Sequence, residues 1–592
     1  MKKYILFLII IIILPLNLAA NYPLKITKVI VEGNKSISAN EIKSDLPIQG
    51  VSIIKRIKKI IPFIEKEQDP LYYEVDFINS LKYIVNLYQK NGFLQAQVSY
   101  KISYNKDKAF VNFYIEENNR IIIDSISINN EKSTEIHDIL EKKTSKWINS
   151  NFTDNEFYHI KNQIEKECLE NSYLMQKVSY TLDVNADTTK VHISFNIKEG
   201  EQYQIQKIDV KGLDHIAEKT VKGQLPVHQN TMYKPSLTDY YFNQINQLNH
   251  FKSISVDTDP IDGSSNEAAI TIKVHEKSKH QFRSGIGYGL EDKVRAFIEY
   301  NQYNFLGNAR QLQISIKSSA LEPWNINLKT REPLPLRHSL YGTINPFWMK
   351  QKENIYEIER LGYILGLTQH INVANTYQIL YLFEHDHLYT AEVFETDELL
   401  PYYNKSSVYL SWFSNYLKTN KGISNNISLL RSGIGFNSQY HFFRLLNNTQ
   451  IYYSLTSRNT LAFQAKYGSI TSFDNDKIIP IEERFFAGGA NSIRGWSRNE
   501  ISPINENDEK TGGNKLFELS LENRYLLLKD LEFALFLDVG NVWSKKEDFS
   551  DLLKSAGFGM RYYTILGPIR LDFARPVNID KWQFYLQIGQ SF

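Results

Sequence analysis

The sequence has few of the features that mark several common classes of protein. Its 592 residues include one cysteine, Cys168, which excludes an internal disulfide framework and a multi-cysteine metal site. Lysine and arginine (68) nearly balance aspartate and glutamate (66), so no basic surplus indicates nucleic acid. The mean hydropathy is −0.37 and one long apolar run is present, which excludes a protein with many membrane-spanning helices. With 17 prolines, 28 glycines and 42% hydrophobic residues, extensive disorder is not expected.

The long apolar run lies at the N-terminus. Two lysines precede the apolar stretch 4–14, and the small residues Ala19 and Ala20 follow it. This order is typical of a secretory signal peptide, and the stretch is short for a membrane-anchoring helix. We therefore expect residues 1–20 to be a signal peptide and the mature protein to be exported.

A repeated pattern follows the predicted signal peptide. Residues 91–100 (NGFLQAQVSY) are similar to residues 171–180 (NSYLMQKVSY), and a weaker copy, aligned on Val256, begins at Asn249. Each copy follows a helical pattern such as that of residues 75–88, and an alternating run comes after it. Each unit also opens with a short apolar strand. The sequence thus predicts the order strand, helix, helix, strand, strand in three domains, at residues 21–118, 119–201 and 202–278.

From residue 279 onward the helical periodicity gives way to alternation with a period of two. In residues 531–539 the odd positions are apolar, while Glu532 and Asp538 lie at even positions. A strand with one apolar and one polar face fits two architectures. These are a soluble β-sandwich and a transmembrane barrel with a water-filled interior.

Two features of this region favour the barrel. The polar face carries charges that a sandwich core would not accept unpaired. They are Glu518, Glu522, Asp538 and Asp572. Aromatic pairs such as Tyr402-Tyr403 stand near the expected strand ends, where a membrane barrel has aromatic girdles. We therefore expect a multidomain chain in which three α+β domains are followed by a transmembrane antiparallel β-barrel of about 16 strands at residues 279–592.

The most specific stretch of the chain is residues 484–496 (RFFAGGANSIRGW). Its glycines permit positive φ and a close backbone approach, which indicates a shaped loop that presents Arg494. Apolar neighbours such as Ile493 and Trp496 suggest that the loop packs inside the barrel rather than being an ordinary exposed loop. A buried arginine requires a carboxylate partner.

These residues resemble the inward-folded loop of the BamA/TamA superfamily of outer-membrane assembly proteins. Residues 536–540 (FLDVG), 567–574 (GPIRLDFA) and 589–592 (GQSF) are similar to other patterns of that family. The resemblance identifies the three repeats as polypeptide-transport-associated (POTRA) domains, and three of them are typical of the TamA type. It implies that Asp538, in the barrel wall, pairs with the loop arginine. The loop motif carried over from the family is Gly488, Gly489, Ile493, Arg494, Gly495 and Trp496.

The resemblance implies a function in assembly of the outer membrane. The protein would help to insert or translocate β-barrel and autotransporter-type proteins through a lateral seam between its first and last barrel strands. The seam residues would be Gly285, Gly287, Gly289, Phe584, Leu586, Gly589 and Phe592. The expected partners are unfolded outer-membrane clients, outer-membrane lipid and a TamB-like protein of the inner membrane, with no cofactor, metal or nucleic acid. The expected location is the outer membrane of a Gram-negative bacterium, with the POTRA domains in the periplasm.

Other interpretations remain open. A BamA-like general insertase and a polypeptide secretion pore of the two-partner type have the same architecture. An enzyme is not expected. The glycines of residues 285–289 are superficially similar to a dinucleotide-binding loop, but they stand in a strand pattern, and the helix that such a loop requires does not follow them. His385 and His387 share one face of a strand and could form a metal pair, or they are ordinary polar residues of the barrel. Around residues 53–62 the first repeat has an extra basic and apolar segment, either a partner-docking surface or a lengthened loop and helix.

Overall fold

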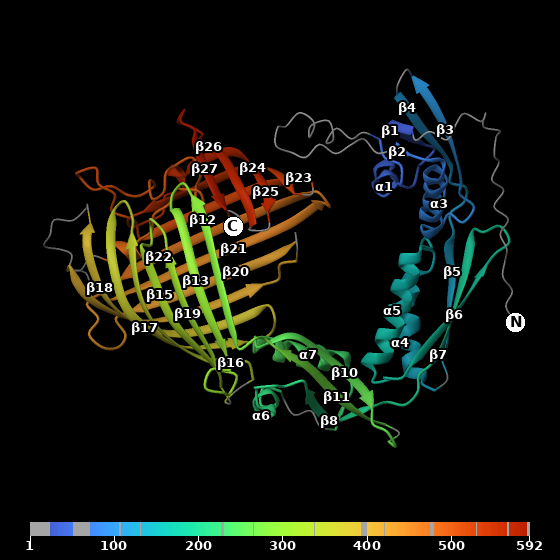
Figure 1. The fold of residues 1–592 in the computed structure, drawn as a ribbon, viewed down its shortest axis with the longest axis horizontal. Coiled ribbons are helices and arrows are strands. Elements are labelled where there is room, and N and C mark those ends of the chain that lie inside the picture. Colours follow the sequence, from blue (N-terminus) through green and yellow to red (C-terminus); the bar gives the residue numbers. More distant parts are fainter. Residues whose placement is uncertain are drawn as a thin grey trace. The chain divides into compact units, whose positions relative to one another are not determined.

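The computed structural model describes most of the chain after the predicted signal peptide. The described residues are 24–50, 71–105, 108–130, 132–225, 230–264, 266–334, 336, 338–391, 400–418, 421–473, 479–528, 530–564 and 567–588. The signal peptide, the extra basic segment at 53–62, Gly589 and Phe592 lie outside them. The chain forms two compact units, Met1–Gln204 with Met232–Pro235, and Ile205–Thr231 with Ser236–Phe592 (Figure 1).

The first unit contains two α+β folds. The first of them consists of β1 (Leu24–Glu32), α1 (Ala39–Ser44), β2 (Leu71–Tyr72), α3 (Glu74–Lys90), β3 (Gln97–Asn105) and β4 (Lys108–Glu116). Its sheet has the order β2-β1-β4-β3, and β1 runs parallel to β4. Ile84 and Tyr88 of α3 are buried in one core with Phe113 of the sheet, so the apolar face of this helix covers the strands.

The second fold has the same order, except that an isolated bridge between Ile122 and Asn151 stands in place of the short second strand. It consists of β5 (Ile122–Asn130), α4 (Thr134–Thr144), a 3₁₀ turn (Ser145–Trp147), α5 (Asp154–Glu170), β6 (Lys177–Val184) and β7 (Lys190–Lys198). The sheet order is β5-β7-β6, and β5 runs parallel to β7. The single cysteine, Cys168, is buried in its core, and burial raises the pKa of this thiol to about 12.

A third fold of the same kind belongs to the second unit. It consists of β8 (Gln204–Lys211), α6 (Glu218–Lys222), β9 (Thr231–Met232), α7 (Pro235–Gln247), β10 (Phe251–Pro260) and β11 (Glu267–Glu276). Its strands have the order β10-β11-β8-β9. Strand β11 leads directly into the barrel.

One carboxylate recurs at the same place in all three folds. Glu117, Glu199 and Glu276 each stand at or just beyond the end of the last strand and accept hydrogen bonds from backbone N–H groups in the turn after the first strand. The donors are Lys35 and Ser36 for Glu117, Lys132 and Ser133 for Glu199, and Asp214, His215 and Ile216 for Glu276, at 2.6–3.3 Å. Because the same contact between a carboxylate and a turn occurs in each fold, the three folds share one architecture.

Strand register corrects one detail of the predicted repeat. Val98 and Val178 each pair with the residue two positions before the recurring glutamate. In the third fold the residue in that place is Ile254, which pairs with Val274, and not Val256. The sequence alignment on Val256 was wrong by two residues because the connection from helix to strand is shorter there.

The rest of the second unit is one sheet of 16 strands, each antiparallel to its neighbours in sequence order. The strands are β12 (His280–Gly289), β13 (Lys293–Tyr303), β14 (Gln311–Ser318), β15 (Trp324–Pro333), β16 (Leu340–Lys352), β17 (Tyr356–His370), β18 (Asn375–Ala391), β19 (Tyr402–Asn415), β20 (Gly422–Ser432), β21 (Phe442–Thr456), β22 (Asn459–Ser472), β23 (Lys515–Leu528), β24 (Leu531–Trp543), β25 (Leu553–Thr564), β26 (Gly567–Pro576) and β27 (Gln583–Ile588). The sheet curls into a nearly closed barrel (Figure 1), which confirms the predicted architecture and strand number.

Side chains alternate across the barrel wall. Leu535 and Leu537 are each 54% exposed on the outer face, whereas Asp538, which directly follows Leu537, is fully buried. The aromatic pair at the start of β19 is divided in the same way: Tyr402 is exposed and Tyr403 is buried. The prediction that both tyrosines belong to an outer girdle is therefore wrong for Tyr403, because adjacent strand residues point to opposite faces.

Among the residues that the structure describes, no helix combines the length and the apolar character needed to cross a bilayer.

Candidate functional site

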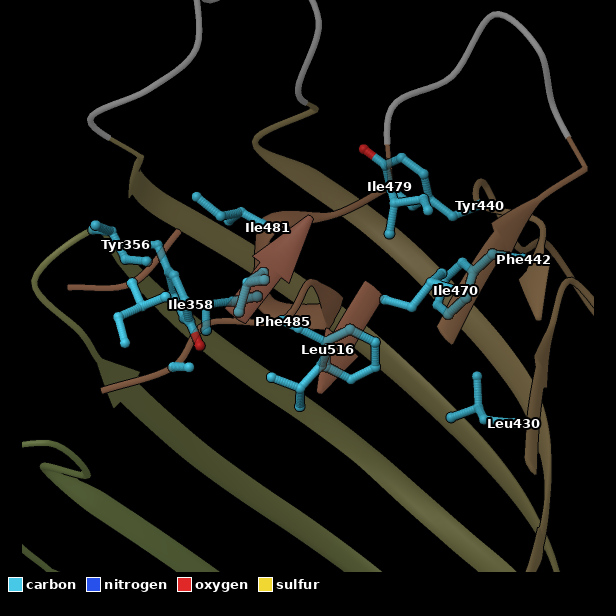
Figure 2. Close-up of a cluster of buried hydrophobic side chains, with 14 of the residues drawn as sticks. Tyr356, Ile358, Leu430, Tyr440, Phe442, Ile470, Ile479, Ile481, Phe485 and Leu516 are labelled. Carbon is cyan, nitrogen blue, oxygen red and sulfur yellow. The ribbon is translucent and has the colours of Figure 1, made fainter. Parts of the chain in front are cut away.

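The most specific stretch of the sequence lies in the long connection between β22 and β23; its described part, residues 479–514, is here called the inward loop. Its two arms pair with each other: Phe485 exchanges backbone hydrogen bonds with Gly513, and Ala487 with Ile501, at 2.8–3.0 Å. Figure 2 shows Ile481 and Phe485 of the loop among apolar side chains of the barrel wall. The loop therefore packs inside the barrel.

Glycines give the loop its shape. Gly488, Gly489 and Gly495 have φ of 97°, 102° and 101°, a conformation that favours glycine. A Cβ on Gly495 would lie 3.1 Å from the backbone nitrogen of Pro576, and a Cβ on Gly488 would lie 2.4 Å from the carbonyl oxygen of Ser497. A larger residue at Gly495 would push the tip of the loop away from the wall, and one at Gly488 would clash within the tip itself.

The structure brings Arg494 and Asp538 together. The guanidinium donates from Nε to Asp538 Oδ2 at 2.7 Å and from Nη2 to Oδ1 at 2.8 Å, a forked pair of charge-assisted bonds. The backbone N–H of Arg494 also donates to Oδ2 of Asp538, at 3.1 Å. Arg494 is 1% exposed and Asp538 is fully buried, so the pair is shielded from solvent.

Arg494 has further partners that the sequence did not assign to it. Nη1 donates to Glu522 at 2.5 Å and to Asp572 at 3.4 Å, and Nη2 donates to the hydroxyl of Ser520 at 3.2 Å. The guanidinium carbon lies 3.4 Å from the centre of the Phe536 ring. Glu522 and Asp572 were predicted to face the lumen, but their convergence on one arginine depends on the path of the loop.

Three more arginines complete this cluster in the wall. Arg524 pairs with Glu522 at 2.8 Å, and Arg561 pairs with Glu522 at 3.0 Å. Arg561 and Arg570 each lie 3.2 Å from an oxygen of Asp572. Charges of both signs therefore alternate through a buried network, which is the arrangement that makes buried ion pairs tolerable.

A second buried cluster holds the first arm of the loop. The ammonium of Lys405, on β19, is fully buried and lies 2.6 Å from Glu483 and 3.4 Å from Glu482 of the loop. It also lies 3.1 Å from Glu384 and 3.4 Å from Asp386, both on β18. The loop is thus anchored to the wall at two separate places. No motif in the sequence predicted this anchor, and the one signal for it was a lysine at a lumen-facing strand position.

The histidines considered as a metal pair lie on the other face of β18. His385 Nδ1 is 2.8 Å from Asn404 Oδ1, and the ring of His387 stacks on Tyr402 with centroids 4.1 Å apart. Asp386, between them, faces inward to Lys405. No group of three potential ligands that could hold a metal ion occurs within the described part of the chain.

The first and last strands of the barrel meet at the predicted seam. Between β12 and β27 the described residues form no strand ladder, and one backbone bond joins the two sides, from the N–H of Leu290 to the carbonyl of Leu586 at 3.3 Å. Every other pair of neighbouring strands is joined by a ladder. Phe584 is exposed on the outer face of this joint.

The glycines of β12 have a packing role at the seam. A Cβ on Gly285 would lie 2.5 Å from the ring of Phe297, and one on Gly287 would lie 2.7 Å from Arg295 Nε. Both neighbours belong to β13. Gly289 leaves room for the carboxylate of Asp292 in the same way. The absence of side chains at Gly285 and Gly287 therefore lets side chains of β13 lie across the first strand.

The tip of the inward loop contacts both sides of the seam. The N–H of Ala490 donates to Glu291, in the turn after β12, at 2.9 Å. The N–H of Gly495 donates to the hydroxyl of Tyr585, on β27, at 2.8 Å. The loop thus connects the two strands where the ladder does not.

Comparison with known proteins agrees with this architecture. Residues 304–592 match the model of the Omp85 superfamily domain, and residues 24–118 and 203–277 match the POTRA model, described as a surface antigen variable number repeat. The outer membrane protein assembly factor BamA of Neisseria meningitidis serogroup B is 20% identical over 647 residues, covering 96% of this chain and 78% of that protein. BamA of Nitratidesulfovibrio vulgaris is 22% identical over 621 residues, with coverages of 98% and 75%.

A solved structure shares the fold. The crystal structure of BamA from Haemophilus ducreyi lacking POTRA domains 1–3 superimposes with a TM-score of 0.59 at 20% identity, covering 79% of this chain and 99% of that one. An Omp85 barrel and POTRA domains thus occur together in one chain. The chain belongs to the BamA/TamA superfamily and is an outer-membrane protein of a Gram-negative bacterium, with its POTRA domains in the periplasm.

Proposed function

We propose that this protein is an outer-membrane assembly factor that helps unfolded client proteins to enter the membrane as β-barrels. The observation that carries the proposal is the joint between β12 and β27, where the residues that the structure describes form one backbone hydrogen bond, whereas every other joint has a ladder. Unpaired backbone groups are costly in lipid, so an edge of this kind favours pairing with an incoming strand.

The proposed mechanism is non-enzymatic. A client strand would add to the free edge of β12 or β27 by β-augmentation, and later strands would follow it. The client gains backbone hydrogen bonds and buries its apolar face in lipid, and these changes supply the free energy of insertion. The inward loop would hold the two edges at a defined spacing, since its tip contacts Glu291 on one side and Tyr585 on the other.

A finer assignment is also part of the proposal. We propose that the middle fold, from β5 to β7, is a third POTRA domain, because it has the same order of helices and long strands and the same recurring carboxylate, Glu199. Three such domains are the TamA arrangement. On that basis the clients would include autotransporter-type proteins, and a TamB-like protein of the inner membrane would dock on the periplasmic domains.

Covalent closure of the seam tests the proposal. Leu290→Cys and Leu586→Cys place thiols on residues joined by the one seam bond, and both have the outward parity of their strands. The background is Cys168→Ala, which removes the native thiol. We expect oxidation of the double variant to stop assembly of a heat-modifiable barrel client and reduction to restore it. Each single-cysteine variant is the control.

Full assembly by the oxidised double variant would contradict the proposed seam mechanism. A second readout follows the client directly: a thiol at residue 290 or 586 should crosslink to a cysteine in a client strand during assembly. A secretion pore of the two-partner type predicts the opposite result, since its substrate crosses through the lumen and the locked seam would leave transport intact.

A further inference from the structure

A polar cavity of about 330 Å³ lies inside the barrel wall near its POTRA end. Strand β11 leads into β12 at this end, so the turns after β15 and β17 are periplasmic. The cavity is bounded by the end of α7 and by β15 to β18. Its lining residues are Gln247, Asn249, Lys329, Arg331, Thr343, Thr368, His370 and Gln378.

The charges of this cavity are unbalanced. Lys329 and Arg331 are both cationic, and none of the lining residues that the structure describes is a carboxylate. The lumen clusters described above differ from it, since Arg494 has three carboxylates within 3.4 Å and Lys405 has four. Two cations beside hydroxyl and amide groups favour an anionic ligand.

The guanidinium of Arg331 is held in place for such a ligand. It lies 3.5 Å from the centre of the Tyr341 ring, and its Nη2 donates to the carbonyl of Gln247 at the end of α7, at 3.0 Å. The side-chain amide of Gln247, which lines the same cavity, is buried, and neither its nitrogen nor its oxygen forms a hydrogen bond with any residue that the structure describes. Buried amides are normally satisfied, so this one indicates a polar ligand.

Access to the cavity decides which anion it takes. Strands β15 to β18 are joined by ladders, and all the lining strand residues have lumen-facing parity. Between β15 and β16 the pairing skips Leu328 and Lys329 but resumes in the same register, so the two strands stay side by side. Lipid outside the barrel therefore has no route through this wall. An anion reaches the cavity from the lumen or the periplasm, where an unfolded polypeptide would arrive.

We infer that this cavity binds a carboxylate group of a client polypeptide as it enters the periplasmic mouth of the barrel. The inference rests on the proposed assembly function for the identity of the ligand. Lys329 supplies a point charge, and Arg331 supplies a planar fork that matches a carboxylate. The hydroxyls of Thr343 and Thr368 complete a donor set suited to an anionic group.

Binding of small probes to the full-length protein in neutral detergent tests this site. The probes are an N-acetylated tetrapeptide of glycine and alanine with a free C-terminal carboxylate, the same peptide with a C-terminal amide, and inorganic phosphate. We expect the acid to bind about tenfold or more tightly than the amide, since charge-assisted hydrogen bonds of this kind are lost with the charge. Saturation-transfer NMR measures both affinities.

Variants locate the binding. Lys329→Gln should weaken binding of the acid about tenfold, and Arg331→Lys should weaken it less because the charge remains. The matched control is Lys317→Gln, on the neighbouring strand β14, with the same lumen-facing parity and outside the cavity lining. The control should leave the affinity within about twofold.

Three results would overturn the inference. They are equal binding of acid and amide, equal effects of Lys329→Gln and Lys317→Gln, and phosphate binding that the acid peptide does not displace, which identifies a site for free inorganic anions. The seam experiment separates the two proposals. If the locked seam leaves assembly unchanged while the acid binds as expected, the assembly function fails and the anion site stands.

Discussion

Tyr585 and Gly495 tie the last barrel strand to the inward loop. The N–H of Gly495 donates to the phenol oxygen of Tyr585 at 2.8 Å, and the same phenol donates to the carbonyl of Trp496 at 2.8 Å. Tyr585 is 5% exposed, so both bonds are shielded from water. Through Tyr585 alone, the strand at the edge of the seam thus has two bonds to the loop, compared with one backbone bond to the β12 side among the described residues.

Tyr585→Phe should loosen the seam while the barrel still folds. The change removes one hydroxyl and leaves a buried backbone N–H and a buried carbonyl without this partner, at a cost of about 1–3 kcal/mol for an unsatisfied group. We expect faster modification of a single cysteine at position 586 by a membrane-permeant thiol reagent. The matched control is Tyr525→Phe on the outer face of β23. Equal rates in the two variants would mean that the phenol does not hold the strand.

The recurring carboxylate Glu117 predicts a pH dependence for the first POTRA fold. Burial raises the pKa of this carboxyl, but hydrogen bonds from Ser36, Lys35 and Tyr88 outweigh burial, and the net pKa is lowered. A lowered pKa in the folded state means that the stabilisation is present above the unfolded value of about 4.3 and is lost as the pH falls through the folded value.

Glu117→Gln tests that linkage. The variant should lose about 1 kcal/mol at pH 7, a modest figure because Glu117 is partly exposed. Unfolding of residues 21–278, followed by circular dichroism between pH 3 and pH 7, should show a smaller slope for the variant below about pH 4.3 than for the wild type. Glu116→Gln, at an exposed neighbouring position, is the control. An unfolded wild-type fragment would instead contradict the predicted boundary at residue 278.

The coupling of Arg494 to Asp538 can be measured by a double-mutant cycle on assembly activity and on loop docking. Removing one partner of a buried pair costs roughly 3–5 kcal/mol by precedent. We expect the losses from Arg494→Ala and Asp538→Ala to be non-additive by about 0.5–3 kcal/mol, as is usual for groups in one network. Because Glu522 lies 2.5 Å from the same guanidinium, a second cycle with Glu522→Gln should also show coupling. Strictly additive losses in both cycles would mean that the network does not act as a unit.

The sequence predicted those parts of the site that depend on local patterns. Strand alternation placed Asp538 toward the lumen, because parity is a property of neighbouring residues. The glycines around Arg494 predicted a shaped loop for a similar local reason. The pattern could not show that Lys405 meets Glu482 and Glu483, since that contact joins residues about 80 positions apart through the path of the loop. The room that Gly285 leaves for Phe297 likewise depends on cross-strand register.

Lys405 gives the sharpest test of the second anchor. Its ammonium is the cation nearest to Glu483, at 2.6 Å, and it also faces Glu384, Asp386 and Glu482. Lys405→Met keeps most of the side-chain volume but leaves four buried carboxylates with less compensation, so the first arm of the loop should leave the wall at a cost of about 3–5 kcal/mol.

Two readouts distinguish release of this arm from general unfolding. The purified barrel should keep its heat modifiability, because the ladders of β12 to β27 do not depend on Lys405. Ion conductance in planar bilayers should rise, because the loop arm no longer fills its part of the lumen. Lys418→Met, in an exposed turn, controls for loss of a lysine. Unchanged conductance in Lys405→Met would show that the arm is held by its apolar contacts, among them Ile481 and Phe485, rather than by the ion pairs.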